Sequence, residues 1–350
     1  MPADRVLLAS PRGFCAGVEK AIKALAWMVR VFEPPVYCYH EIVHNRHVVE
    51  QFRARGVVFV DDVDEVPAGA PLMLSAHGSA PEVVAAARGR HRVVVDAVCP
   101  LVTKVHHELK VRARKGYSVL YVGHEGHEEA VGTMAVAPEA VHLVQSEAAV
   151  DELAGRLEPG TQVALLAQTT LSHDEWAGIM GRARQRFPEL WMPNRSDLCF
   201  ATTNRQAALK AIAGRSDAVV VIGSENSSNT RALEKVARAL CPRVLRINQA
   251  DELPDDLSGI VGVTAGASAP EELVDLVLAR LAPVHGVEEV HVTDEDEYFP
   301  PPPELRDLLR GLTSALSLGL GAPASPDADA DTGSSDRTVS AADVLVALAG

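Results

Sequence analysis

The feature that most constrains the fold of this chain is a repeated alternation of short β-branched runs with helical patterns. From Arg5 to about Pro283, runs such as RVLLAS, DAVVVIG and GIVGVTA are each followed by a stretch with apolar residues at helical spacing. An apolar run followed by a helix is typical of a βα unit, which places parallel strands beneath covering helices. The alternation therefore predicts an α/β fold with mainly parallel sheets.

The first helical pattern illustrates this periodicity. Val18, Ile22, Leu25 and Val29 stand at offsets of 0, 4, 7 and 11, which lie on one face at about 3.6 residues per turn. Ser172, with a glutamate three residues later, carries the capping-box signal of another helix start.

The positions of three cysteines suggest how the chain is divided. The 350 residues allow two or three domains. Cys15, Cys99 and Cys199 each follow an apolar run and precede a helical pattern, and two strand ends share the letters SAPE. We therefore expect duplicated α/β subdomains with one cysteine each, spanning residues 1–98, 99–196 and 197–284.

The remaining chain is expected to form a C-terminal arm over 285–310 and a largely disordered extension over 311–350. From about Gly321 the sequence GAPASPDADADTGSSDRT has too few apolar residues to form a core. The final AADVLVALAG has the composition of a short apolar helix, which is marginally stable alone.

Composition excludes several classes of function. Aromatic residues make up only 4% of the chain and the net charge is -14, so neither a nucleic-acid surface nor binding to an anionic membrane is predicted. The N-terminal MPADRVLLAS lacks the charged and apolar regions of a signal peptide, and no apolar stretch approaches membrane-spanning length. We expect a cytoplasmic protein.

The five cysteines form no CxxC pair and are odd in number, so a disulfide framework is not expected. Cys38 and Cys241 fit buried packing positions. The other three cysteines suit zinc with a fourth histidine ligand, or an iron-sulfur cluster. Because zinc sites usually draw ligands from close pairs, single cysteines from three subdomains fit a cluster better. Three such ligands leave one iron of a 4Fe-4S cluster open as a Lewis acid.

Polar and imidazole side chains also collect at predicted strand ends, where α/β proteins bind ligands. The candidates are His44, His77, His127, Glu129, Gln168, Thr169, Ser227, Ser228 and Asn229. Each also has an ordinary interpretation as a surface histidine or a helix cap, and Ser79 and Ser268 fit N-caps. Hydroxyl, amide and imidazole groups suit phosphate oxygens. Neither GxxxxGK[ST] nor GxGxxG occurs, so no nucleotide is implied.

Taken together, the motifs resemble the 4-hydroxy-3-methylbut-2-enyl diphosphate reductase (LytB/IspH) family, which catalyses the last step of the non-mevalonate isoprenoid pathway. The resemblance runs from about Val6 to Pro300. It rests on ordered motifs: PRGFCAGV, VHNRHVV, SAHG, DAVCPLVTKVH, GHEGH, QTTLS, CFATTNRQ, GSENSSN and GVTAGASAPE.

The resemblance implies three similar α/β subdomains around a central 4Fe-4S cluster, one per chain. Cys15, Cys99 and Cys199 would be its ligands, with one iron open. The substrate, chiefly its diphosphate, would be held by His44, His77, His127, Thr169, Ser227, Ser228, Asn229 and Ser268, which replaces the N-cap interpretation of Ser268 alone. Glu129, His127 and Thr169 would be catalytic, and Gln168 would lie behind them.

The implied reaction is a two-electron reductive dehydroxylation. The allylic alcohol would bind the open iron, the hydroxyl would leave as water, and a proton would add at either end of the allyl fragment. The products would be isopentenyl and dimethylallyl diphosphate. This chain departs from the family at residue 128, where Glu128 replaces the usual proline and offers a carboxylate that competes with Glu129. On spacing, Glu129 matches the proton donor.

The resemblance also implies an external electron donor such as ferredoxin or flavodoxin. An alternative is a cluster- or zinc-binding protein that senses redox state or a metabolite without turnover, although such a protein has no need of Glu129 and Thr169. A third hypothesis is an α/β phosphate-binding protein with incidental thiols.

Overall fold

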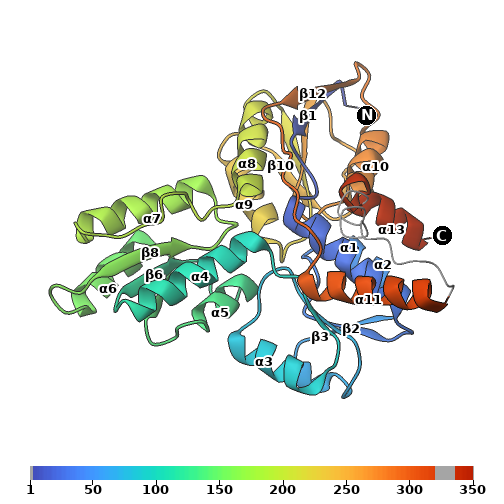
Figure 1. Cartoon of the computed structure of the whole chain (residues 1–350). Coiled ribbons are helices and arrows are strands. Elements are labelled where there is room, and N and C mark those ends of the chain that lie inside the picture. The colour runs from blue at the N-terminus through green and yellow to red at the C-terminus, as the bar shows by residue number, and fades with distance from the viewer. Residues whose placement is uncertain (1–2, 320–335, 350) are drawn as a thin grey trace.

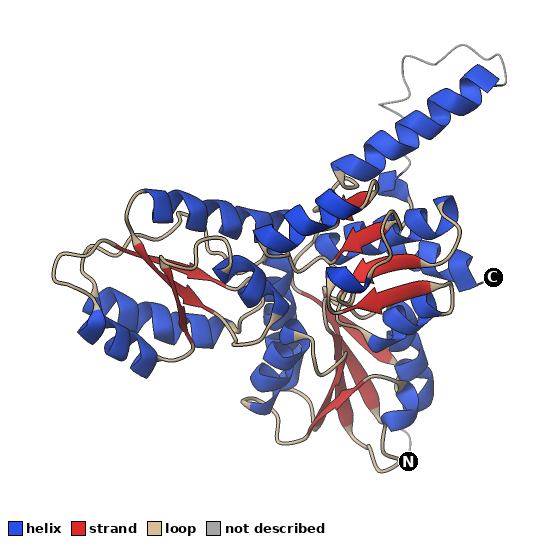
Figure 2. Ribbon diagram, turned by 90° about the horizontal axis from the view of Figure 1, so that it is seen from below, coloured by secondary structure: helices blue, strands red, loops and turns tan. Residues whose placement is uncertain are grey.

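Three parallel sheets make up the structure, a computed structural model that describes residues 3–319 and 336–349. Each sheet and its helices form one lobe, and the lobes meet at the centre of the molecule (Figure 1, Figure 2). All pairings between the named strands are parallel. The predicted α/β fold with parallel sheets is therefore confirmed.

The first lobe holds a sheet of strand order β3-β2-β4-β5. Its strands are β2 (Val36–Tyr39), β3 (Val57–Val60), β4 (Leu72–Leu74) and β5 (Val94–Asp96). Its helices are α1 (Ala16–Val31), α2 (Arg46–Arg53) and α3 (Pro81–Arg90), with a 3-10 turn η1 (Val63–Glu65). Ile22 and Leu25 of α1 are fully buried and Val18 and Val29 pack beside them, which confirms the predicted helical face.

The second lobe holds a sheet of order β7-β6-β8. Its strands are β6 (Ser118–Val122), β7 (Val141–Val144) and β8 (Val163–Ala167). Its helices are α4 (Pro100–Arg114), α5 (Glu128–Met134), α6 (Glu147–Arg156) and α7 (His173–Arg186). Ser172 caps α7 by accepting from the Glu175 amide, as predicted. The central strand β6 and its neighbour β8 are wholly buried, as expected where helices cover a parallel sheet.

The third lobe holds a sheet of order β10-β9-β11-β1-β12. Its strands are β1 (Arg5–Ser10), β9 (Ala218–Ile222), β10 (Val244–Ile247), β11 (Ile260–Ala265) and β12 (Val287–His291). Its helices are α8 (Phe200–Ala213), α9 (Ser228–Arg238) and α10 (Glu271–Leu281), with a 3-10 turn η2 (Ala250–Glu252). Apolar clusters lie on both faces of this sheet.

Strand β1 departs from the expected division at residue 98, because it lies in the third sheet. It pairs with β11 on one side, Leu7 beside Gly262, and with β12 on the other, Leu7 beside Glu288. Part of the expected C-terminal arm is thus an edge strand of the same sheet. A run of apolar residues specifies a strand, but it does not specify which sheet that strand joins.

The end of the chain also differs from expectation. Residues 320–335 of the extension expected to be largely disordered lie outside the described residues. Helix α11 (Pro303–Gly319) crosses the expected boundary at residue 310, and residues 336–349 include helix α13 (Ala341–Ala349), which packs against α1 and α2. A ten-residue segment alone would form a helix only marginally, so it is tertiary packing that stabilises α13.

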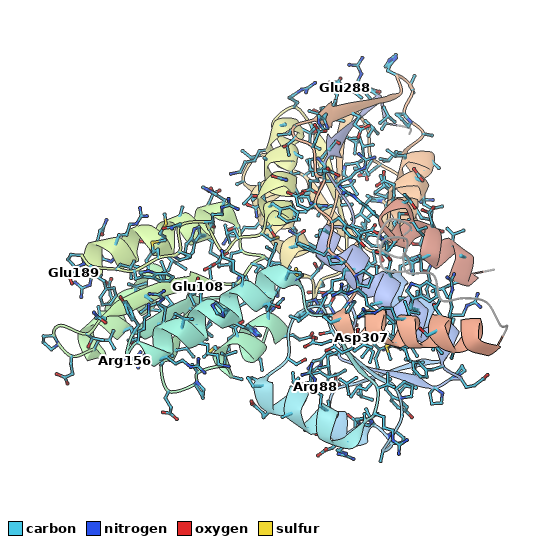
Figure 3. All side chains as sticks on the ribbon, in the orientation of Figure 1. Arg88, Glu108, Arg156, Glu189, Glu288 and Asp307 are labelled. Atoms are coloured by element: carbon cyan, nitrogen blue, oxygen red, sulfur yellow. The ribbon has the colours of Figure 1, made fainter. Side chains whose placement is uncertain are left out.

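Charged side chains lie on the outer surfaces of the lobes, as the labelled residues of Figure 3 illustrate. Among the residues that the structure describes, no helix combines the length and the apolarity needed to cross a membrane. The centre, where the lobes meet, is where the cysteines lie.

Candidate active site

Each of the three predicted metal-binding cysteines is the N-cap residue of a helix. Cys15 precedes α1, Cys99 precedes α4 and Cys199 precedes α8. Their backbone amides donate to the carbonyls of Ala267 (3.2 Å), Ala76 (3.0 Å) and Thr169 (3.0 Å), respectively. The positive ends of three helix dipoles therefore meet at the cysteines, where they would stabilise the negative charge of metal-bound thiolates.

All of the predicted site residues line one cavity of about 100 Å³ between the lobes. They are Cys15, Cys99, Cys199, His44, His77, His127, Glu129, Thr169, Ser227, Ser228, Asn229 and Ser268. By contrast, Cys38 lies in β2 with no exposed surface and Cys241 is 3% exposed, so both are packing residues as predicted. The fold thus collects one set of residues from every lobe.

The sulfur atoms lie in a tight and largely dry space. A Cβ atom on Gly17 would come within 2.8 Å of Cys99 Sγ and 3.9 Å of Cys15 Sγ, so only glycine fits there. Burial raises the pKa values of Cys99 and Cys199 to about 12. These thiols therefore hold their protons unless a metal takes the proton's place, which is the ordinary chemistry of a thiolate ligand.

Glu129 is the completely buried acid of the cavity. Thr169 donates to it twice, from its amide to Oε1 (2.7 Å) and from its hydroxyl to Oε2 (2.9 Å). Burial raises the pKa of Glu129 to about 7, although the two hydrogen bonds from Thr169 act in the opposite direction. Near neutral pH this carboxyl group therefore exists in both protonation states, as a proton donor requires.

His127 caps α5, and its Nδ1 accepts a hydrogen bond from the Glu129 amide (3.2 Å). Burial, together with the neighbouring His77 and His44, lowers the pKa of His127 to about 3. The ring is therefore neutral, and because Nδ1 accepts, its proton lies on Nε2. His127 thus has one ring N–H available as a donor in the cavity.

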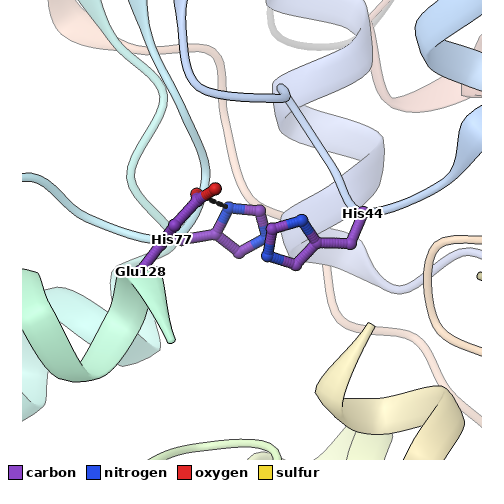
Figure 4. A group of neighbouring side chains, drawn as sticks. All are labelled: His44, His77 and Glu128. Atoms are coloured by element: carbon purple, nitrogen blue, oxygen red, sulfur yellow. Dashed lines mark ion pairs between the residues drawn. The ribbon is translucent and has the colours of Figure 1, made fainter. Parts of the chain in front are cut away.

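His44 and His77 form a stacked pair beside His127. Their ring centroids lie 3.8 Å apart with an angle of 10° between the planes, and Glu128 Oε2 lies 2.9 Å from His77 Nδ1 (Figure 4). The potential ligand atoms of His44, His77 and Glu128 lie within 4.8 Å of one another. A metal ion binds an imidazole nitrogen in the plane of the ring, however. The planes of two stacked rings are nearly parallel, so one ion cannot lie in both of them. The pair is better suited to two oxygens of an anion.

Glu128 is ionised in this arrangement. Burial alone would raise the pKa of Glu128, but its interactions with His77 and the charges of His44 and His40 lower it to about 2. The residue that replaces the family's usual proline therefore adds a negative charge at the edge of the histidine pair.

The start of α9 supplies hydroxyl and amide groups. Ser227 caps this helix by accepting from the Thr230 amide, and Ser228 Oγ accepts from Gln168 Nε2 at 3.0 Å. Asn229 Oδ1 accepts from the Ala267 amide at 3.0 Å. Gln168 thus lies behind the cavity wall, as predicted.

The two serines given N-cap interpretations do not cap helices. Ser268 Oγ donates to the His44 carbonyl at 2.9 Å, while α10 begins after Pro270. The prediction that Ser79 caps α3 is wrong, because Ala80 occupies that position and Ser79 Oγ is buried without a hydrogen bond among the described residues. Pro81 begins this helix, where a missing N–H costs nothing.

Several residues around the cavity were missed by sequence reasoning. Phe299 lines it and lies 6.4 Å from the ring of Phe200. His124 contacts both Glu175 (3.2 Å) and Ser228 (3.4 Å). Arg205, only 1% exposed, lies behind the Cys15 loop. The motif CFATTNRQ contains Arg205, but the long-range contacts of these residues leave no local pattern.

Comparison with known proteins agrees with this geometry. The family model described as LytB protein matches residues 6–282. A 4-hydroxy-3-methylbut-2-enyl diphosphate reductase of Rhodopirellula baltica is 48% identical over 313 residues, which cover 87% of this chain and 97% of that protein. The protein of the same name from Mycolicibacterium paratuberculosis is 49% identical over 308 residues, covering 86% of this chain and 92% of that protein.

Two solved structures are also similar. The E-1-hydroxy-2-methyl-but-2-enyl-4-diphosphate reductase of Plasmodium falciparum matches with a TM-score of 0.85 at 30% identity, covering 89% of this chain and 100% of that chain. A structure of (E)-4-hydroxy-3-methyl-but-2-enyl diphosphate reductase, described as the terminal enzyme of the non-mevalonate pathway, has a TM-score of 0.58 at 29% identity. It covers 81% of this chain and 99% of its own.

Proposed function

This chain belongs to the LytB protein family, and we propose that it catalyses the family's reaction with the residues of the central cavity. It is an oxidoreductase that converts 4-hydroxy-3-methylbut-2-enyl diphosphate to isopentenyl and dimethylallyl diphosphate. The observation that carries the residue assignment is the convergence of three helix-capping cysteines and the buried Glu129 on one cavity.

Cys15, Cys99 and Cys199 hold one 4Fe-4S cluster in this proposal. Its support is the donor set itself: three free thiols at helix N-termini that line one cavity, with Gly17 leaving room for them. When bound, such a cluster supplies electrons and one iron without a protein ligand.

The diphosphate occupies the side of the cavity formed by the histidine pair and the start of α9. His44 and His77 each offer ring nitrogens there, and Ser227, Ser228 and Asn229 surround the helix N-terminus, which attracts anions. Ser268, held against the His44 carbonyl, closes this side of the cavity.

Glu129 delivers protons, with His127 and Thr169 completing the relay. The reaction consumes two electrons and two protons: one C–O bond breaks, the hydroxyl leaves as water, and one C–H bond forms at either end of the allyl fragment. Thr169 holds both carboxyl oxygens of Glu129, so the acid is fixed in orientation before the substrate binds. The electrons come from a carrier such as ferredoxin or flavodoxin, and the enzyme works in the cytoplasm.

The proposal is tested by anaerobic oxidation of reduced methyl viologen by the reconstituted protein. Addition of 4-hydroxy-3-methylbut-2-enyl diphosphate should start rapid viologen oxidation, with both isomeric diphosphates as products. The matched variant Cys15→Ser should remain folded but lose turnover. Iron and sulfide analysis of both proteins accompanies the assay.

Two outcomes would contradict the proposal. Full activity in Cys15→Ser would remove that residue from the cluster. No viologen oxidation by protein with an intact cluster would favour a sensor of redox state or of a metabolite instead. A protein that takes up neither iron nor sulfide would be a phosphate-binding protein with incidental thiols.

A further inference from the structure

Each of the three cysteines is followed by a basic residue at nearly the same spacing along the sequence. Lys20 follows Cys15 by five residues, Lys104 follows Cys99 by five, and Arg205 follows Cys199 by six. Each lies on the helix that its cysteine caps. Long side chains on a helix point back toward its N-terminus, so all three extend toward the cysteine end of their helix.

Lys20 connects the first cysteine helix to the second cysteine loop. It is 8% exposed, and its Nζ donates to the carbonyl of Val98 at 2.8 Å. Val98 immediately precedes Cys99. Helix α1 therefore holds the backbone that presents Cys99.

Lys104 connects the second cysteine helix to the third cysteine loop. Its Nζ contacts the carbonyls of Arg195 (3.4 Å) and Ser196 (3.5 Å) and the carboxylate of Asp197 (3.3 Å). The other Asp197 oxygen accepts from the Ala167 amide at the end of β8. Helix α4 therefore holds the segment that leads to Cys199.

Arg205 connects the third cysteine helix to the first cysteine loop. It is 1% exposed; its Nε donates to the Gly13 carbonyl (2.9 Å) and its Nη2 to the Phe14 carbonyl (3.0 Å). Its charge is balanced by Glu295, whose two oxygens lie 2.9 and 3.0 Å from Nη1. Helix α8 therefore holds the two residues before Cys15.

We propose that Lys20, Lys104 and Arg205 are positioning residues that form a closed ring, in which the helix of each cysteine fixes the loop of the next. The proposal rests on the assignment of the three cysteines as cluster ligands. The carbonyls bonded by the buried Lys20 and Arg205 are fixed in direction, because breaking such a bond leaves a desolvated charge. Lys104 is less buried, but it pairs with the fully buried carboxylate of Asp197. The ring thus sets the spacing of three thiols that come from distant parts of the chain, and it places positive charge beside an anionic ligand set.

Lys23 offers a matched control for the ring. It lies one turn after Lys20 on the same helix, is 7% exposed, and donates to a backbone carbonyl at 2.8 Å. That carbonyl belongs to Asp336, in the C-terminal segment, and not to a cysteine loop. Loss of Lys23 therefore removes an equally buried cation without touching the ring.

The test is hydrogen–deuterium exchange of the purified metal-free protein in the variants Lys20→Met, Lys104→Met, Arg205→Met and Lys23→Met. The reporters are the amides of the cysteines and the residues just before them. We expect about tenfold faster exchange at the next loop in each ring variant: at Cys99 for Lys20→Met, at 195–199 for Lys104→Met, and at 13–15 for Arg205→Met. Lys23→Met should leave all three loops unchanged, and Lys20→Arg should restore the protection of Cys99.

A second measurement counts iron per chain after reconstitution and its loss to a chelator. Each ring variant should lose iron faster than Lys23→Met does. Faster exchange spread evenly over the chain, or unchanged exchange at the three loops, would overturn the ring. Lys104 is the most exposed of the three, with 37% of its side chain accessible, so Lys104→Met should still fold. It therefore tests the ring even if Arg205→Met does not fold. Viologen turnover of the unmodified protein tests the proposed function separately, since exchange is measured without cluster or substrate.

Discussion

At Glu129 the burial of one carboxyl group leads to a pH prediction. Its pKa of about 7 leaves the proton-donating form populated below that pH, so kcat should fall as the pH rises above about 7. Glu129→Gln should lower kcat about 10²- to 10⁴-fold, the usual contribution of a positioned acid, and should remove this pH limb. Steady-state viologen assays across pH measure both effects. Persistence of the limb in the glutamine variant would assign it to another group.

The same residue affects folding in a defined pH window. Folding raises the pKa of Glu129 from its ordinary value of 4.5 to about 7, so the folded state favours the protonated carboxyl group. Its contribution to stability is therefore fully present below about pH 4.5 and is lost as the pH rises through about 7. Glu129→Gln should therefore flatten the free energy of unfolding across that window. Denaturant unfolding at several pH values, with Glu189→Gln as an exposed control, gives this slope.

Glu128 allows a direct test of the departure from the family pattern. The preceding residue, His127, has φ -71° and ψ 134°, the extended conformation that a proline requires before it, and position N1 of a helix accepts proline readily. Glu128→Pro should fold and lower the KM for the diphosphate about fivefold, since a nearby like charge contributes about 1 kcal/mol. Glu128→Gln removes the charge alone and should act in the same direction. A higher KM in both variants would mean that Glu128 assists binding through His77.

At the scale of elements, the packing of α13 predicts how substitutions on its two faces change the stability of the fold. Ala341, Val344, Leu345 and Leu348 form one buried face against α1 and α2, and Asp336 accepts from Tyr298 at 2.8 Å. Leu345→Ala should destabilise the fold by about 2–5 kcal/mol, as for other buried leucines. The neighbouring Val346 is 67% exposed, so Val346→Ala should change stability by less than about 0.5 kcal/mol. Equal effects in thermal unfolding would show that α13 is not packed in solution.

Individual elements were predictable where the determinant is local. The apolar face of α1 and the cap of α7 follow from residues within a few positions of one another. The sheet assignment of β1 and the packing of α13 were not predictable, because they depend on partners hundreds of residues away in sequence. The ordered motifs identified the site residues. Lys104 lies inside one of those motifs and Lys20 lies two residues after another, but neither shows a local sign of its distant partner.

At the scale of the whole molecule, the site is a property of three lobes rather than of any one. Cys15, Cys99 and Cys199 come from segments that form separate cores, yet all line one cavity. Sequence alone indicated one cysteine per subdomain, but the distances between them depend on how the lobes pack. That packing is fixed by long-range contacts such as Arg205 to Gly13 and Ser268 to His44.

The position of β1 also bears on the order in which the protein is made. Val6 leaves the ribosome before its partner Val287 on β12, which follows roughly 280 residues later, about 15 to 55 s at ordinary rates of translation. Until then the strand that leads to Cys15 lacks one of its two neighbours. The three-thiol pocket is therefore complete only once β12 has been synthesised, so metal loading must follow translation of the segment from β1 to β12.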